Sequence, residues 1–330
     1  MADCVDWRVP FSFLMKMWNK YSLVMGLLSI IIYFQRPVFA SDWEQTLEPA
    51  LAHMGAGAFD KALPLLEEQA NNGNGLAQFN LALFFKLGWV GEPDHNKACV
   101  WFEKAAHNDI PVAQYEYAQC LSNNESKVKV AIKWYKRAYE RQVINAGCEA
   151  GQLLIKHSTD EAELRQGVTL CIEAAERGSI EAALKVAGWY QNGKYLQQNY
   201  TSAMRYYTLA APDKQPLAAF ELGKLLDAGL GVQADSRQAA YWYEVAASQG
   251  YAAAYLPVAA LYWKLAQEAQ TNQPHLLAKA YLWGSTAKRQ RLSATPEVVE
   301  QLHERISATV PDTWKENLDK KILDHIRRFH

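Results

Sequence analysis

The residues that could carry chemistry in this sequence are few and scattered. A zinc hydrolase motif places two histidines four residues apart on one helix, with a glutamate after the first. His303 and Glu304 match its start, but residue 307 is not a histidine. Gly55-Ala56-Gly57 lacks the preceding strand and the lysine of a phosphate-binding loop. No Gly-x-Ser-x-Gly nucleophile motif occurs. The sequence therefore predicts no enzyme, no metal site and no cofactor.

Composition and charge narrow the class of partner. Hydrophobic residues make up 50% of the 330 residues, which indicates a folded chain with a core. Lys and Arg number 34 against 35 Asp and Glu, and no long run of one sign occurs. Nucleic-acid binding needs a concentrated positive surface. We therefore expect no nucleic-acid partner, and nothing indicates a small-molecule substrate.

The N-terminus has the order of a secretory signal. Lys16 and Lys20 precede an apolar stretch at 21–34, and Pro37-Val38-Phe39-Ala40 ends in a small residue. The pattern predicts a signal peptide over residues 1–40, with translation starting at Met15 or Met17 and cleavage after Ala40. An uncleaved anchor in the inner membrane is the alternative, although the stretch is shorter than the ~20 residues of a spanning helix. Export to the periplasm is the expected localisation.

An internal repeat organises the rest of the chain. Segments 97–106 and 238–247 share their small and aromatic residues position by position. One large residue marks each unit, at intervals of 36, 33, 36, 36, 36 and 41 residues: Leu65, Trp101, Trp134, Leu170, Tyr206, Trp242 and Trp283. Around each marker the small and large residues recur at helical spacing, which predicts one amphipathic helix per unit. Glycines such as Gly178 and Gly250 follow eight residues after a marker, and they predict where this helix ends.

A second helix in each unit is predicted ahead of the marker. It begins at an alanine and has a small residue five positions later, which allows close helix packing. The starting alanines are Ala77, Ala113, Ala146, Ala182, Ala218 and Ala254. Asp94, Asn199 and Asp235 stand where the following helix needs an N-cap.

Residues 218–250 carry the pattern Ala-x-x-x-Leu-Gly, Gly-x-Gly-Val, Trp-Tyr and Ala-Ala-x-x-Gly. This pattern resembles a Sel1-like repeat, a relative of the tetratricopeptide repeat. The resemblance covers about residues 56–292, as a lone second helix at 59–73 and then six helix pairs. It implies an all-α fold, a right-handed superhelical solenoid of stacked antiparallel helix pairs with a long surface for proteins or peptides. The units at Ala113 and Ala146 lack the Gly-x-Gly-Val loop.

The repeats divide the chain into three parts. We expect a signal peptide at 1–40, a Sel1-like solenoid at 41–292 and two amphipathic helices at 293–330. Repeat arrays need a polar terminal cap, and these helices fit that role. Docking of a partner on them is the alternative.

Four cysteines follow the signal, while Cys4 lies in or before it. Cys99 and Cys120 are equidistant from the turn at 109–110, and Cys148 and Cys171 from the turn at 159–160. In an antiparallel helix pair such residues face each other, so bridges 99–120 and 148–171 are predicted. The competing interpretation is four small buried apolar side chains. Bridges within helix pairs are also what the resemblance to exported bacterial members implies.

Three aromatic residues fall outside the core positions of the repeat. Trp89 lies in an interhelix loop, and Tyr255 and Trp263 occupy first-helix positions that are mostly polar or small elsewhere. We predict these three as partner contacts.

The resemblance implies a non-catalytic periplasmic scaffold that binds protein partners and organises an envelope assembly, of the flagellar-motor or of the secretion and polysaccharide type. Contact with the membrane is expected only through those partners. One alternative is a cell-wall-directed hydrolase or penicillin-binding member of the family. Another is an adaptor of the endoplasmic reticulum, with glycosylation at Asn124 and Asn199.

Overall fold

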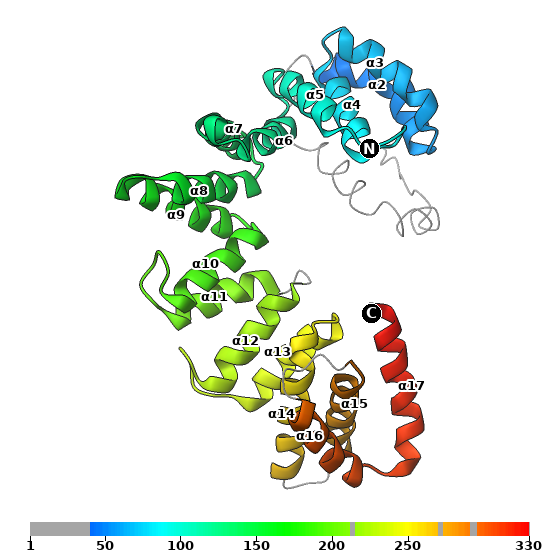
Figure 1. Ribbon diagram of the computed structural model, residues 1–330, viewed down its shortest axis with the longest axis vertical. Helices are drawn as coiled ribbons and strands as arrows, with labels where there is room; N and C mark the ends of the chain where they lie inside the picture. The colour runs from blue at the N-terminus through cyan, green and yellow to red at the C-terminus, as the bar shows by residue number, and fades with distance from the viewer. Residues whose placement is uncertain (1–39, 212–214, 270–272, 291–295, 330) are drawn as a thin grey trace, which may run out of the picture. The chain divides into compact units, whose positions relative to one another are not determined.

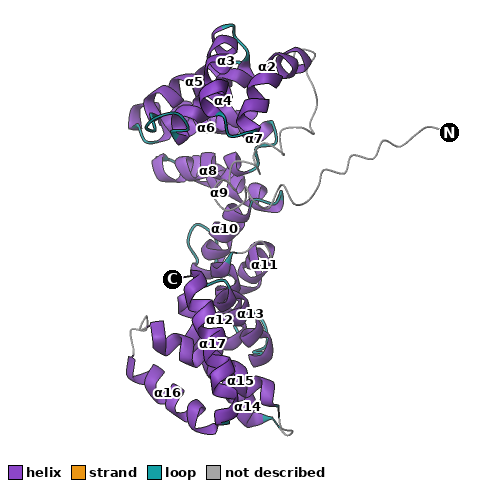
Figure 2. Ribbon diagram, turned by 90° about the vertical axis from the view of Figure 1, so that its right-hand side faces the viewer, coloured by secondary structure: helices purple, strands orange, loops and turns teal. Residues whose placement is uncertain are grey.

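The computed structural model describes residues 40–211, 215–269, 273–290 and 296–329, and in these ranges the chain is helical without a β-strand (Figures 1 and 2). The predicted signal segment before Ala40 and Cys4 lie outside the described residues. The chain divides into two compact units, residues 1–108 and residues 109–330. We describe each unit by itself.

The first unit contains α2 (Ala40–Gly55), α3 (Phe59–Asn71), α4 (Gly75–Leu87) and α5 (His95–His107). The prediction of a lone helix at 59–73 is wrong, because α2 is its partner. Leu47 and Ala50 of α2 are each 1% exposed and share a core with Ala62 and Leu66 of α3. The spacing of Leu47, Ala50 and Met54 is that of one helix face, so the sequence contained this signal.

The second unit continues the pairing of antiparallel helices. Its helices are α6 (Pro111–Ser122), α7 (Val128–Glu140), α8 (Asn145–His157), α9 (Glu161–Glu176), α10 (Ile180–Asn192), α11 (Tyr200–Ala210), α12 (Pro216–Ala228), α13 (Ser236–Ser248), α14 (Tyr255–Glu268), α15 (Pro274–Gln290), α16 (Pro296–Thr309) and α17 (Asp312–Phe329). Each helix packs chiefly on its neighbours in sequence. The fold is therefore a solenoid of stacked helix pairs, as the sequence predicted.

Local signals place the helix ends where the repeat pattern predicts them. The side chain of Asp235 accepts hydrogen bonds from the backbone N–H groups of Arg237 and Gln238, both at 2.9 Å. Asp94 and Asn199 cap α5 and α11 in the same way. These caps satisfy donors that the first turn of a helix leaves without a partner.

Small residues set the distance between paired helices. All six starting alanines are fully buried, from Ala77 to Ala254. In the pair α8–α9 two glycines face each other: a Cβ built on Gly151 would lie 2.4 Å from the carbonyl oxygen of Gly167. The two backbones are therefore in direct contact, and no larger residue fits at this position without moving a helix.

The loop between α10 and α11 departs from the repeat. Tyr195 has a φ of +65° at the position where the next repeat has Gly231, with a φ of +76°. A bulky residue rarely adopts this left-handed conformation. The Tyr195 ring is 39% exposed and meets the ring of Trp189 edge to face, with the centroids 5.3 Å apart.

The two helices expected after the repeats are present as α16 and α17. Figures 1 and 2 show α17 beside α15, and Ile322 of α17 and Ile306 of α16 are fully buried in the core of the last repeats. Phe329 packs against the turn at Gly250. The pair covers the apolar end of the array, which fits the expected cap.

Candidate interaction surfaces

The three aromatic residues predicted as contacts have different surroundings. The Trp89 ring stacks on Phe59 at 4.9 Å between centroids and meets Phe84 edge to face at 5.0 Å. Trp89 is thus half-buried and closes the apolar core of α2–α4. Trp263 is also half-buried, against the core of the last repeats.

Tyr255 lies in the core, so a surface role does not fit its position. Its ring is 1% exposed and stacks on Trp283 at a centroid distance of 5.8 Å. The ring of His325 from α17 covers it, with the Tyr255 hydroxyl 3.1 Å from Nε2. The sequence pattern of a single repeat could not reveal this burial, because α17 is 70 residues away.

The uncovered face of four first helices carries a regular set of side chains. At the positions three and six residues after the starting alanine, α6, α8, α10 and α12 have residues that are half-buried or exposed. We call this set the first-helix row; it consists of Glu116, Gln119, Glu149, Gln152, Lys185, Gly188, Glu221 and Lys224.

Hydrogen bonds hold two members of the row, Glu221 and Lys224. The hydroxyl of Tyr207 donates to Oε1 of Gln191 at 2.5 Å, and Nε2 of Gln191 donates to Oε2 of Glu221 at 2.8 Å. Nζ of Lys224 donates to the same carboxylate oxygen at 2.8 Å. Side chains that are already ordered lose less conformational entropy when a partner binds.

The environment of the row is partly desolvated around α8. Burial raises the pKa of Glu149, while Lys185 lowers it and Glu181 raises it further. Burial likewise raises the pKa of Tyr115 to about 12, with Glu149 acting in the same direction. Charged groups in such surroundings interact more strongly than groups in open water.

The predicted bridge between α8 and α9 is present. Sγ of Cys148 and Sγ of Cys171 are 2.05 Å apart, and both residues are buried. Cys99 and Cys120 are also disulfide-bonded. A disulfide stabilises mainly by restricting the unfolded chain, and the bridge between Cys148 and Cys171 joins one of the two helix pairs that lack the Gly-x-Gly-Val loop.

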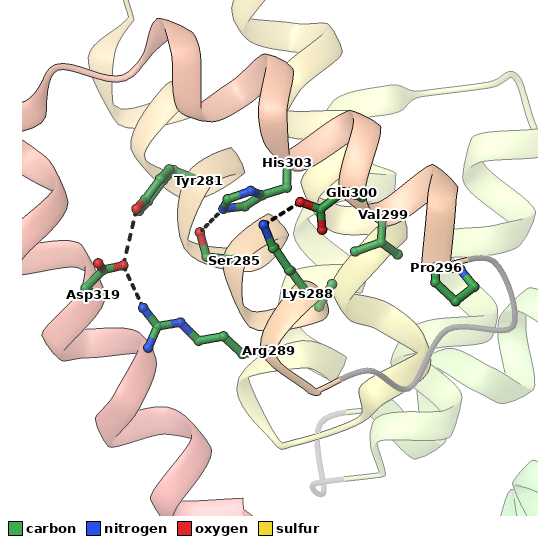
Figure 3. Close-up of a pocket in the computed structure, with 10 residues that line it drawn as sticks. Tyr281, Ser285, Lys288, Arg289, Pro296, Val299, Glu300, His303 and Asp319 are labelled. Atoms are coloured by element: carbon green, nitrogen blue, oxygen red, sulfur yellow. Dashed lines mark hydrogen bonds and ion pairs between the residues drawn. The ribbon is translucent and has the colours of Figure 1, made fainter.

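A pocket lies between α15, α16 and α17 (Figure 3). It has a volume of about 710 Å³. Lys288 pairs with Glu300 at 2.5 Å, and Arg289 pairs with Asp319 at 3.3 Å. Figure 3 shows these two ion pairs on either side of Ser285, another residue that lines the pocket.

A histidine reaches the floor of this pocket from α16. Nε2 of His303 is 3.1 Å from Oγ of Ser285, which is 3% exposed. Burial lowers the pKa of His303, and Lys288 acts in the same direction. At neutral pH the imidazole is therefore uncharged, and it forms one hydrogen bond with the hydroxyl of Ser285.

This lowered pKa predicts a loss of stability in mild acid. The unfolded chain takes up the proton near the usual histidine pKa of about 6.5, before the folded chain does. The stability contributed by neutral His303 is present above that pH and is lost as the pH falls. Between about pH 7.5 and about pH 5, the melting temperature should fall further in the unmodified chain than in His303→Gln, as followed by circular dichroism. If the melting temperature falls by the same amount with pH in both proteins, the lowered pKa of His303 is contradicted.

The described residues contain no group of three or more His, Cys, Asp or Glu that could hold a metal ion. No helix among them is long and apolar enough to cross a membrane. Fold and surfaces together define a helical-repeat protein whose uncovered row of side chains suits the binding of another protein.

Comparison with known sequences gives the family. The Sel1 repeat matches residues 75–109, 111–143, 180–211 and 216–251, so the chain is a Sel1-repeat protein. The match omits the disulfide-linked pair α8–α9, although the structure forms a helix pair there. Sel1-repeat proteins generally mediate protein–protein interactions.

Two curated relatives and two solved structures illustrate the likeness. An uncharacterized protein of Neisseria meningitidis is 26% identical over 248 residues, which is 74% of this chain and 50% of the relative. Chitin synthase regulatory factor 3 of Schizosaccharomyces pombe is 25% identical over 58% of this chain and 26% of its own. The chain thus spans half or less of the length of these two relatives.

The solved structures support the fold. A Sel1 repeat protein from Oxalobacter formigenes has a TM-score of 0.59 at 24% identity and covers 74% of this chain and 99% of its own. The protective antigen c5321 of uropathogenic Escherichia coli has the same TM-score at 20% identity, over 81% of this chain and 56% of its own.

Proposed function

We propose that this protein is an exported, periplasmic scaffold that binds protein partners through the first-helix row and organises an envelope assembly. It acts by binding and not by catalysis. The observation that carries the proposal is the row itself, a set of half-buried or exposed residues on the first helices of four successive repeats, of which Glu221 and Lys224 are held by hydrogen bonds.

Two features support the exported location. The N-terminal order of lysines, apolar stretch and small residues is that of a secretory signal. The disulfide between Cys148 and Cys171 belongs to an oxidising compartment, because cytosolic thiols are kept reduced. The periplasm meets both conditions.

Export is tested by fusing alkaline phosphatase, which is active only outside the cytosol, to the C-terminus of the full chain. We expect phosphatase activity, and a mature N-terminus at Ser41 by mass spectrometry. An inactive fusion would contradict export, and an active fusion with an intact N-terminus would indicate the uncleaved anchor.

Gly188 offers a precise test of the binding surface. A Cβ on Gly188 would meet no atom within 4 Å, so a side chain added there starts in open space on the row. Gly188→Trp should therefore block a partner, whereas Gly188→Ala should not. The measurement is affinity capture from cross-linked envelope of the native cell, followed by mass spectrometry.

We expect one defined envelope complex with the unmodified chain and with Gly188→Ala, and its loss with Gly188→Trp. Glu173→Trp is the matched control, because Glu173 is exposed on α9 outside the row. Equal recovery with Gly188→Trp would contradict the proposed surface. Turnover of cell-wall fragments by the purified chain would instead favour the hydrolase alternative.

A further inference from the structure

The pocket between α15, α16 and α17 has the size and the polar groups of a ligand site. Its volume of about 710 Å³ lies within the range of roughly 300–1,000 Å³ that small-molecule pockets occupy. Tyr281 and Val299 provide apolar surface, and charged groups of both signs converge on it. The matched Sel1 repeats end at residue 251, so this pocket is separate from the first-helix row.

Each of the two ion pairs can open, so that its charged side chains bind a ligand in place of each other. The side chains of Lys288 and Glu300 are 40% and 46% exposed, and those of Arg289 and Asp319 are 39% and 37% exposed. Ion pairs this accessible to water add little to stability. Opening them to admit a ligand therefore costs the fold little.

The charge balance of the pocket selects the class of ligand. Two cations and two anions line it, and His303 is neutral at pH 7 because burial lowers its pKa. A ligand with a single charge can engage only one of the two ion pairs. A ligand with one charge of each sign, at opposite ends, can engage both, by binding the cation of one pair and the anion of the other. The Lys288 side chain that this releases is 40% exposed and stays in contact with water.

The contacts also indicate the orientation of such a ligand. Asp319 accepts a hydrogen bond from the Tyr281 hydroxyl at 3.2 Å, so it keeps a partner when Arg289 turns to a ligand. The planar guanidinium of Arg289 suits a carboxylate, which it can bind through two parallel hydrogen bonds. At the other side of the pocket, the Glu300 carboxylate suits an ammonium group.

We propose that this pocket binds a short peptide with free termini, its carboxylate on Arg289 and its ammonium group on Glu300. Apolar side chains of the peptide lie against Val299 and the ring of Tyr281. Ser285 and His303 form the polar floor beneath the peptide backbone. The two ion pairs lie on opposite sides of Ser285 (Figure 3), so a ligand that contacts both must span the pocket between them.

The test is isothermal titration calorimetry of the full chain with trialanine at pH 7.5. We expect saturable binding that weakens at least tenfold when either terminus is blocked, as in N-acetyl-trialanine or trialanine amide. Arg289→Gln should weaken trialanine at least tenfold and leave the affinity of trialanine amide unchanged. Glu300→Gln should weaken trialanine likewise and leave the affinity of N-acetyl-trialanine unchanged.

Lys320→Gln is the control, because Lys320 is exposed on α17 and does not line the pocket. Far-UV circular dichroism and the melting temperature report whether each variant is folded. Absence of saturable trialanine binding to the folded, unmodified chain would overturn the proposal. Equal binding of the blocked peptides, or affinities unchanged in both pocket variants, would overturn it as well.

Discussion

Gly151→Ala should destabilise the pair α8–α9 by about 2 kcal/mol, although alanine is normally the better helix residue. The added methyl group would lie 2.4 Å from the carbonyl oxygen of Gly167 and 3.1 Å from Sγ of Cys171. Neither the backbone nor the disulfide can move aside cheaply. The measurement is urea unfolding followed by circular dichroism, with amide hydrogen exchange to locate the loss in α8 and α9.

The control is the same substitution at Gly188, in the first helix of the next repeat and one position after the residue equivalent to Gly151. Gly188→Ala meets no atom within 4 Å, so only helix propensity changes, and stability should rise by about 0.5–1 kcal/mol. If Gly151→Ala lowers the stability and Gly188→Ala raises it, Gly151 is required for close packing of the two helices. A stabilising effect at both positions would contradict the contact between α8 and α9.

Removal of the bridge between α8 and α9 should lower stability by about 2–4 kcal/mol. The double variant Cys148→Ala/Cys171→Ala keeps the site apolar, so the effect reports the loss of the cross-link that joins residues 23 apart in sequence. Because each repeat packs on its neighbours, hydrogen exchange should accelerate first in α8 and α9.

Non-reducing peptide mapping of protein purified from the envelope checks the bridge itself. It should yield a cross-linked fragment that contains Cys148 and Cys171. Free thiols at both positions, together with an unfolding midpoint that the double variant leaves unchanged, would contradict both the bridge and the oxidising location.

The repeat period is the reason that so much of the fold could be predicted from the sequence. The starting alanines and the caps at Asp94 and Asp235 recur at fixed distances, and each needs only its own helix pair to be interpreted. The bridge between Cys148 and Cys171 followed from symmetry about a turn for the same reason.

The surfaces were harder to predict because they depend on contacts between distant residues. Tyr255 occupies a first-helix position, yet His325 of α17 covers it. The pocket requires α15, α16 and α17 to meet, and single residues such as Arg289 and Asp319 give no sign of their pairing. Helix α2 was missed because it precedes the first repeat marker, although its apolar spacing was present.

The most direct test of the central claim, that the first-helix row binds a protein partner, is photo-cross-linking in the living cell. A photoreactive benzoylphenylalanine replaces either Gln119, exposed within the row on α6, or Glu173, exposed outside it on α9. The account predicts a specific cross-linked partner from position 119 and none from position 173. A partner captured only from position 173, or the same products from both positions, would contradict it.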